Sequence, residues 1–267
     1  MRIVRTVAEV REALREPPRG ERIGLVPTMG AYHAGHVALM RAAREASDVV
    51  VVSLFVNPLQ FNSADDLASY PRDEATDAAV ADAEGVDLLF APSADELYPA
   101  GFDTWVEPGS LADELEGAAR PGHFRGVATV CTKLFAIVAP DAAWFGQKDA
   151  QQVAVVRRMV ADLDLAVSIE VVPTVRDVDG LALSSRNMLL SAAEREVALS
   201  LPRALEAGAA ALAAGGDPVA VARDVLDAEP GLSVDYVAVA DFEEPTLVAA
   251  VRVGAIRLID NVVLIDS

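Results

Sequence analysis

The sequence predicts an α/β protein in which a parallel-sheet domain is followed by a smaller C-terminal α+β domain. Apolar runs rich in β-branched residues alternate with stretches of helical spacing, a pattern typical of βαβ units. These runs are short and continuous, as expected for strands that are covered on both faces of a sheet. After about Pro173 the alternation stops, so we expect domains at 1–175 and 176–267, with the boundary near 173–178.

Apolar periodicity locates the elements of the first domain. Strands are expected at 23–26, 49–56, 86–90, 142–145 and 167–172, and helices at 36–46, 73–84, 126–139 and 149–163. Ligands of parallel sheets bind beyond the carboxyl ends of the strands. Polar residues follow three of the expected strands, namely His33 and His36, Asn57 and Gln60, and Gln147 and Lys148. These three segments are expected to converge on one edge of the sheet.

The second domain begins with a long alanine-rich helical pattern at 192–214, which is interrupted at Gly215 and Gly216. A new helix is expected to start at Asp217 and Pro218, because a capping carboxylate followed by proline is typical of a helix N-terminus. Three strand-like runs follow at 234–239, 251–258 and 262–265.

The charge balance limits the partners of this chain. There are 22 basic and 41 acidic residues, a formal net charge of −19 that is spread along the sequence. Such a surface repels nucleic acid and anionic lipid, so we expect neither as a partner. No apolar stretch approaches the roughly 20 residues that span a bilayer, and the start of the chain lacks the apolar region of a secretory signal. A cytoplasmic protein is expected.

The single cysteine, Cys131, cannot form an internal disulfide. It lies in the apolar helical pattern of 127–138, which indicates a small buried hydrophobic residue rather than a reactive thiol.

Two of the three histidines, His33 and His36, lie between an expected strand and an expected helix. Glycines at 30 and 35 permit a turn there, and His36 falls at or beside the first turn of the helix. A helix N-terminus offers backbone N–H groups and a positive dipole end, which suit a polyphosphate. The alternative is a pair of polar turn residues, but the strand before, the glycines and the helix after favour a phosphate site.

The segment His33-Ala34-Gly35-His36 resembles the H-x-G-H signature of the nucleotidylyltransferase superfamily, whose members attack the α-phosphate of a nucleoside triphosphate. Further segments resemble the pantothenate synthetase (pantoate–β-alanine ligase) family in order and spacing, and they lie at 55–61, 120–126, 145–152 and 180–187. The resemblance extends from about Val4 to Ile265. It implies a Rossmann-like, parallel-sheet nucleotidylyltransferase domain.

The resemblance implies an ATP-dependent condensation of (R)-pantoate with β-alanine. The products are pantothenate, AMP and pyrophosphate, and pantoyl adenylate is the intermediate. ATP is a co-substrate and Mg²⁺ is carried with it. Because Mg²⁺ keeps several waters and binds substrate phosphates, it needs few protein ligands, and we assign none. The acidic pairs Asp65-Asp66 and Asp73-Glu74 are interpreted as solvated loop and helix-start charges.

The same resemblance assigns the catalytic groups. His36, the catalytic histidine, and His33 would contact the triphosphate, and Lys148 would add a positive charge. Ser184, Ser185 and Arg186 would close on the phosphates from the second domain, although in isolation this segment also fits a surface turn. The implied ATP-binding set is Met29, Gly30, Ala31, Tyr32, His33, Ala34, Gly35, His36, Gly146, Gln147, Lys148, Asp149, Val175, Leu183, Ser184, Ser185 and Arg186.

Gln60 and Gln152 are expected to hold pantoate, because an amide can donate to a carboxylate and accept from a hydroxyl. Asn57 and Tyr70 lie on a loop where family members place substrate contacts. Two assignments stay open. Asp149 orients the ribose or Lys148, or it caps a helix. The basic group Arg120, His123 and Arg125 shapes the site and supports β-alanine and phosphate binding, or it is a structural loop.

Three positions depart from the usual family pattern. Gln147 stands where Glu is commoner, Ala150 replaces an aromatic residue, and Tyr32 replaces a leucine. We expect activity to survive with altered packing or nucleotide affinity. Tyr32 could stack near the adenine, but filling apolar space is the favoured interpretation.

Two other functions remain as alternatives. One is a nucleotidylyltransferase that stops after a single step, and the other is a catalytically idle nucleotide-binding regulator. The family resemblance also leads us to expect a homodimer formed through the N-terminal domain.

Overall fold

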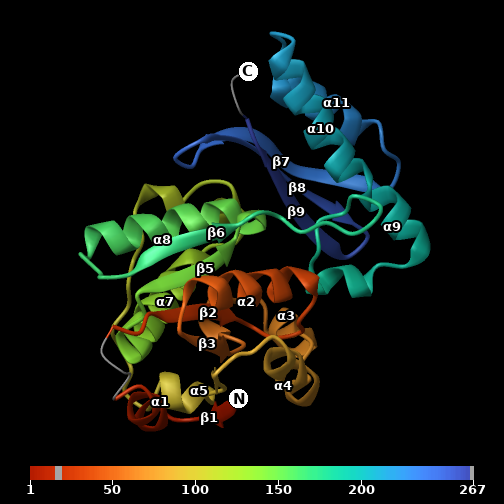
Figure 1. Ribbon diagram of the computed structural model, residues 1–267. Coiled ribbons are helices and arrows are strands. Elements are labelled where there is room, and N and C mark those ends of the chain that lie inside the picture. The colour runs from red at the N-terminus through yellow and green to blue at the C-terminus, as the bar shows by residue number, and fades with distance from the viewer. Residues whose placement is uncertain (16–19, 265–267) are drawn as a thin grey trace. The chain divides into compact units, whose positions relative to one another are not determined.

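The computed structural model describes residues 1–15 and 20–264, which divide into two compact units (Figure 1). The first unit consists of Met1–Gly146 and Gln151–Val172. The second consists of the short segment Gln147–Ala150 together with the chain from Pro173 onward.

The first unit is built on a six-stranded sheet in the order β1-β4-β3-β2-β5-β6. All neighbouring strands are parallel, which confirms the α/β class and the parallel sheet. The order changes direction between β2 and β5, and ligands of open α/β sheets bind at such a point. The strands are β1 (Arg2–Val4), β2 (Ile23–Thr28), β3 (Val49–Leu54), β4 (Leu88–Phe90), β5 (Ala142–Gly146) and β6 (Ser168–Val172).

Helices and short 3₁₀ turns connect these strands. The helices are α1 (Val7–Ala13), α2 (Ala34–Ala46), α3 (Ala64–Ser69), α4 (Glu74–Ala83), α5 (Ala94–Leu97), α6 (Glu116–Ala119), α7 (His123–Val138) and α8 (Ala150–Asp162). The 3₁₀ turns are η1 (Pro58–Gln60), η2 (Ser110–Ala112) and η3 (Gln147–Asp149). The expected strands at 23–172 and the four expected helices are confirmed with small shifts at their ends, whereas β1, α1, α3, α5 and α6 were not expected.

Both faces of the sheet are buried. Leu25 and Val51 belong to one apolar cluster, which includes side chains of α7. Their neighbours Val26 and Val52 belong to another, which includes Met40 of α2. Successive residues of a strand point to opposite faces, so a continuous apolar strand supplies both cores at once.

The second unit contains an antiparallel sheet in the order β7-β8-β9. Its elements are η4 (Ser185–Leu189), α9 (Ala192–Ala198), α10 (Ser200–Ala213), α11 (Pro218–Asp227), β7 (Leu232–Asp241), β8 (Pro245–Val253) and β9 (Ile256–Val263). Leu205 of α10, Leu226 of α11 and Leu247 of β8 meet in its own apolar core.

Two expectations for this unit were wrong in detail. The alanine-rich pattern is not one helix, because α9 ends before Leu199 and a second helix, α10, begins at Ser200. Pro202 lies in the first turn of α10, where a missing N–H costs little. The run at 251–258 is also split, because Gly254, at φ 56°, makes the turn between β8 and β9. The strand expected at 262–265 is the end of β9, and Ile265 lies outside the described residues.

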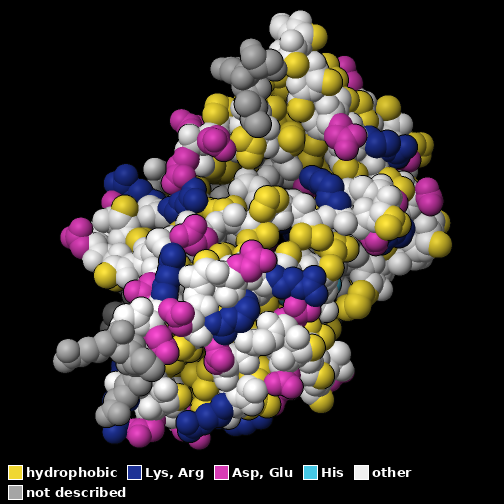
Figure 2. Space-filling model, in the orientation of Figure 1, with side chains coloured by type: hydrophobic (Ala, Val, Ile, Leu, Met, Phe, Trp, Pro, Cys, Tyr) yellow, Lys and Arg dark blue, Asp and Glu magenta, His cyan; other side chains and the backbone are white. Residues whose placement is uncertain are grey.

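Acidic and basic side chains are interspersed on the face drawn in Figure 2. Within residues 1–15 and 20–264, no helix combines the length and the hydropathy that a membrane span requires.

Candidate active site

The turn that follows β2 is held by Asp77, a buried residue of α4. Gly30 and Ala31 adopt positive φ values of 88° and 54°. The Asp77 carboxylate accepts the backbone N–H of Ala31 at 2.9 Å and that of Tyr32 at 2.8 Å. A Cβ on Gly30 would lie 2.7 Å from Asp77 Oδ2, so only glycine lets this carboxylate approach.

The two histidines cap the helix that this turn begins. His33 is the N-cap of α2, and its Nδ1 accepts the Gly35 N–H at 3.1 Å. His36 is the third residue of the helix, and its Nδ1 accepts the His33 N–H at 3.2 Å. The ring centroids are 4.2 Å apart. A nitrogen that accepts a hydrogen bond carries no proton, so hydrogen bonding assigns both neutral rings to the Nε2–H tautomer.

Tyr32 fills apolar space beside this pair. Its ring packs on the cluster that contains Val26 and Met40, and it lies 5.2 Å from the His36 ring. Its hydroxyl is 3.0 Å from Thr28 Oγ1. Burial raises the pKa of Tyr32 despite the hydrogen bond with Thr28, so the side chain stays a neutral phenol.

Asn57 and Gln60 form a buried amide pair at η1, after β3. Asn57 Nδ2 donates to Gln60 Oε1 and to Gly126 O, both at 3.1 Å. Asn57 Oδ1 accepts from the Leu59 N–H and from the Tyr98 hydroxyl. Gln60 Nε2 in turn donates to Met29 Sδ at 2.9 Å. Gln60 is therefore linked to the histidine turn through Met29. Asn57 holds the Gln60 side chain by donating a hydrogen bond to it.

Arg120, at the C-terminal end of α6, and His123, the first residue of α7, secure Gln60. His123 is buried, and its Nδ1 lies 2.9 Å from the Gln60 carbonyl oxygen, which also accepts from Arg120 Nη2 at 3.2 Å. A Cβ on Gly126 would lie 2.3 Å from Leu59 O, so glycine lets α7 approach the η1 backbone. Arg125 is directed elsewhere, with an ion pair to Glu107 at 2.9 Å and its guanidinium 4.1 Å above the Trp105 ring.

Tyr70 and Gln152 are also in the first unit. Tyr70 is buried at the end of α3, with its ring against the edge of Phe61 at 5.6 Å. Gln152 is half-buried on α8. The neighbouring Gln151 has a structural role, because it accepts the Glu116 N–H and donates to the carbonyls of Leu111 and Glu114.

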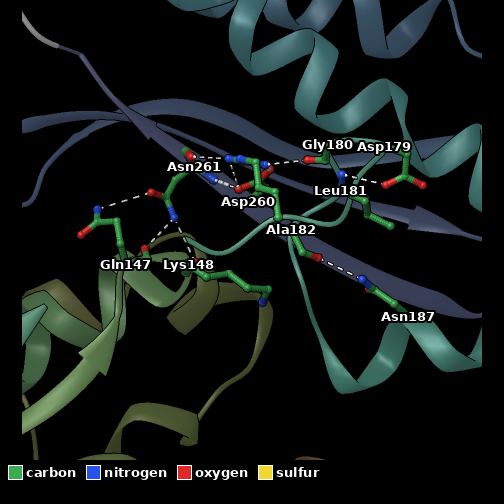
Figure 3. Close-up of polar contacts among 10 residues, drawn as sticks. Gln147, Lys148, Asp179, Gly180, Leu181, Ala182, Asn187, Asp260 and Asn261 are labelled. Atoms are coloured by element: carbon green, nitrogen blue, oxygen red, sulfur yellow. Dashed lines mark hydrogen bonds and ion pairs between the residues drawn. The ribbon is translucent and has the colours of Figure 1, made fainter. Parts of the chain in front are cut away.

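The lysine segment lies in the second unit. Gln147, Lys148 and Asp149 form η3 immediately after Gly146, the last residue of β5. Lys148 Nζ is 3.9 Å from Asp149 Oδ1, which favours Asp149 as a residue that orients the lysine. Asn261 of β9 donates to the carbonyl oxygens of Gln147 and Lys148, both at 2.9 Å (Figure 3).

The serine segment lies in the same unit, on a loop closed by backbone hydrogen bonds. Leu183 N–H donates to Val175 O at 3.0 Å, and Arg176 and Ala182 form an antiparallel bridge. Ser184 is the N-cap of η4, where its hydroxyl accepts the Arg186 N–H at 3.3 Å, and Ser185 is buried. Asn187 Nδ2 donates to Ala182 O at 2.9 Å (Figure 3).

Two supporting features were not foreseen in the sequence. Asp77 is an acidic residue on the buried side of α4, four positions before the buried Ala81. Asp260 and Asn261 interrupt the apolar run of β9. Both carry the same detectable signal, a polar side chain at a position where periodicity expects an apolar one. In the described part of the chain, no group of three or more His, Cys, Asp or Glu side chains is arranged to hold a metal ion.

Comparison with known proteins identifies the family. The model of the pantoate–β-alanine ligase family matches residues 2–263. The pantothenate synthetase of Heliobacterium modesticaldum is 52% identical, with 99% of each chain covered, and that of a Roseiflexus species is also 52% identical, again with 99% of each chain covered. The crystal structure of pantothenate synthetase from Thermus thermophilus has a TM-score of 0.94 at 47% identity, covering 99% of each chain.

A second solved structure is the pantoate–β-alanine ligase of Francisella tularensis, complexed with β,γ-ATP and β-alanine. It has a TM-score of 0.87 at 34% identity and covers 98% of this chain and 97% of that one. Because the family model matches residues 2–263 and a solved member of the family covers 99% of this chain, the chain belongs to the pantothenate synthetase (pantoate–β-alanine ligase) family.

Proposed function

We propose that the protein condenses (R)-pantoate with β-alanine to give pantothenate, with ATP cleaved to AMP and pyrophosphate. Pantoyl adenylate is the intermediate. The observation that carries the proposal is the reciprocal capping of His33 and His36, which sets two Nε2–H donors at the N-terminus of α2. The names of the relatives, pantoate–β-alanine ligase and pantothenate synthetase, indicate pantoate and β-alanine as the substrates.

The proposed order of events follows from the chemistry of a carboxylate. A carboxylate is a poor electrophile because its leaving group would be oxide. Attack by a pantoate oxygen on the α-phosphorus breaks the bond to pyrophosphate and leaves AMP on the acyl carbon. The β-alanine amine then attacks that carbon and displaces AMP, and the amine loses one proton as the amide forms.

The histidines stabilise the departing pyrophosphate in this proposal. Their Nε2–H groups donate to phosphate oxygens, and the positive end of α2 adds to the effect. Such preorganised donors act where charge develops in the transition state, and removal of one typically lowers the rate by about 10² to 10³-fold. Lys148 and Arg186 supply positive charge to the phosphates, together with the hydroxyls of Ser184 and Ser185.

Pantoate is held by Gln60 and Gln152. The Gln60 amide nitrogen carries two hydrogens, of which the Met29 sulfur takes one, so the other can donate to pantoate. Asn57 acts mainly by holding Gln60. The contacts of Arg120 and His123 with the Gln60 carbonyl favour a role in shaping this site over direct binding of β-alanine. Tyr70 remains a proposed substrate contact.

The proposed nucleotide-binding set is the one that the family resemblance assigns. It includes the backbone of the 29–36 turn, the segment 146–149 with Gln147 and Asp149, and Val175 and Leu183 of the serine loop. Mg²⁺ would enter bound to the triphosphate, where it neutralises phosphate charge. The departures at Gln147 and Ala150 are compatible with activity, because Gln147 pairs with Asn261 and Ala150 is buried as a small side chain.

The direct test is purified protein with ATP, Mg²⁺, (R)-pantoate and β-alanine, assayed for AMP, pyrophosphate and the amide. We expect all three products in equal amounts. Pyrophosphate without amide would indicate an enzyme that stops after one step. ATP binding without pyrophosphate formation would indicate a regulator and would contradict the proposal.

His36→Ala tests the role of the histidine pair. We expect kcat to fall by about 10² to 10³-fold, since one preorganised donor is lost, while circular dichroism shows a folded chain. Arg41→Ala, on an exposed part of the same helix, is the matched control and should retain wild-type turnover. Near-normal turnover of His36→Ala would refute the assignment.

A homodimer formed by the first unit and a cytoplasmic location complete the proposal. The dimer follows from the family resemblance, and light scattering of the purified protein tests it. The location fits an enzyme that consumes ATP.

A further inference from the structure

Two adjacent polar residues lie inside β9, where the surrounding chain is apolar. Asp260 and Asn261 are 2% and 5% exposed. Buried polar groups lower stability unless they form hydrogen bonds. Both side chains form several. Asn261 bonds to the lysine segment (Figure 3), and Asp260 bonds to Arg176 at the start of the serine loop.

Asn261 holds the backbone from which Lys148 projects. Its Nδ2 carries two hydrogens and donates to the carbonyl oxygens of Gln147 and Lys148, both at 2.9 Å. Its Oδ1 lies 3.4 Å from Gln147 Nε2, which donates to it. Two consecutive carbonyl groups are thus fixed by one planar amide, and this sets the direction in which the Lys148 side chain leaves the turn.

Asp260 holds the start of the serine loop. Its carboxylate accepts from Arg176 Nη1 at 2.6 Å and from Nη2 at 3.1 Å. Arg176 Nη1 also donates to Gly180 O at 3.1 Å, and so braces the turn that leads to Ser184. Asp260 Oδ1 further accepts the Asn261 N–H at 2.8 Å, which ties the two residues together. A paired Arg–carboxylate contact of this kind is strongly directional.

We propose that Asn261 is a positioning residue for Lys148. The Asp260–Arg176 pair holds the Ser184–Arg186 loop in a fixed position relative to Lys148. The inference rests on the assignments of Lys148 and Ser184–Arg186 made above. Neither Asp260 nor Asn261 contacts substrate in this proposal. They act by attaching two phosphate-binding segments, through hydrogen bonds, to the single strand β9.

Substitutions at Asn261 distinguish the effect of the hydrogen bonds that its side chain donates from the effect of the space that it fills. Asn261→Ala removes both donated hydrogen bonds, and Asn261→Asp keeps the shape but turns a carboxylate toward two carbonyl oxygens. We expect kcat to fall by about 10²-fold in Asn261→Ala and further in Asn261→Asp, with the KM for pantoate little changed. If Asn261 only fills space, the isosteric Asp variant will be the more active of the two, and the proposal is overturned.

A double-mutant cycle with Lys148→Ala tests whether Asn261 acts through the lysine. If it does, Asn261→Ala will add little to the loss already caused by Lys148→Ala. Losses that multiply would show an independent effect of Asn261 and would overturn the inference, while the role of Lys148 would stand. Full activity of Lys148→Ala would instead refute the lysine assignment itself, so the two failures are distinguishable.

Asp235→Asn is the matched control. Asp235 of β7 pairs with Arg252 of β8 and Arg257 of β9, at 3.2 and 2.7 Å, and neither arginine belongs to a phosphate-binding segment. Asp235→Asn should weaken two ion pairs of the same sheet without loss of kcat, whereas Asp260→Asn should lower kcat. Asn261→Ser keeps one hydroxyl donor and should have intermediate activity. It replaces Asn261→Asp in the comparison if that variant does not fold, and activity no higher than that of Asn261→Ala would overturn the proposal.

Discussion

Asp77 orders the histidine turn through two carboxylate oxygens, each of which accepts a different backbone N–H. Asp77→Asn keeps the size of the side chain but turns an N–H donor toward one of these donors. An unsatisfied buried hydrogen-bonding group costs about 1–3 kcal/mol. We expect a loss of stability of that size by urea unfolding. We also expect a lower kcat, because the turn positions His33 and His36.

Asp82→Asn on the same helix is the control for Asp77→Asn. The Asp82 carboxylate is exposed and pairs with the amino terminus at 3.0 Å. An exposed pair of this kind contributes at most about 1 kcal/mol, and Asp82 does not contact the turn. Equal effects of the two substitutions on kcat would show that Asp77 has no particular role there.

Cys131 is expected to make the stability of the fold depend on pH in the alkaline range. Burial raises the pKa of the Cys131 thiol from 9.0 to about 12. Between these values the unfolded chain loses the thiol proton and the folded chain keeps it, so the free energy of unfolding falls as pH rises. Above pH 9 the free energy of unfolding should fall by up to about 1.4 kcal/mol for each unit of pH.

Urea unfolding between pH 8 and pH 11 measures this effect of Cys131 on stability. The wild type is compared with Cys131→Ala at each pH. Tyr32, whose pKa is also raised by burial, is present in both proteins and cancels in the difference. The pKa of Tyr98 is raised by burial and by the charge of Cys131, so part of its contribution changes with Cys131→Ala and counts with the thiol. We expect the wild type to lose stability more steeply than the variant above pH 9. Parallel curves would mean that the thiol ionises equally well in the folded chain.

At the scale of elements, the contact between α7 and η1 depends on a missing side chain. A Cβ at Gly126 would lie 2.3 Å from Leu59 O and 2.7 Å from Gln60 N. Both neighbours are backbone atoms, so Gly126→Ala must move one element. Overpacking of this kind costs about 1–3 kcal/mol. Because Gln60 moves with η1, we expect a higher KM for pantoate in steady-state kinetics.

The control for Gly126→Ala is Gly109→Ala, since nothing lies within 4 Å of the added methyl group and the φ of Gly109 is −77°. It should leave the KM for pantoate unchanged. An unchanged KM in Gly126→Ala as well would mean that η1 does not hold pantoate.

Periodicity predicted the elements that bury a long apolar face, and it failed where the pattern is short or continuous. The six-residue strands β2 and β3 and the 16-residue helix α7 were found. The three residues of β1 are too few to show a period. The break at Leu199 lies in a helical pattern that continues on both sides, so its position depends on tertiary packing.

The motifs point to residues that are proposed to touch ligands, but they do not reveal the residues that hold these side chains in position. His33, Gln60 and Lys148 follow strand ends, which local sequence can reveal. Asp77 and Asn261 act on turns 45 and 113 or more residues away in the sequence. No local pattern specifies such a partner, because the pairing exists only once the sheet and its connections have formed.

At the scale of the whole molecule, the two units have separate apolar cores. Leu25 of β2 and Leu247 of β8 are both 0% exposed, and each belongs to an apolar cluster of its own unit. Truncation of such a leucine to alanine costs about 2–5 kcal/mol. Proteins open locally in cooperative groups of contacts, so each truncation should raise opening in one unit.

Hydrogen exchange followed by mass spectrometry measures this opening peptide by peptide. In Leu247→Ala, we expect faster exchange in peptides of β7, β8 and α10, with those of β2, β3 and α7 unchanged. Leu25→Ala is the reciprocal control and should give the opposite pattern. A uniform rise over both units in either variant would mean that the two cores unfold as one, in which case a single stability would describe the chain.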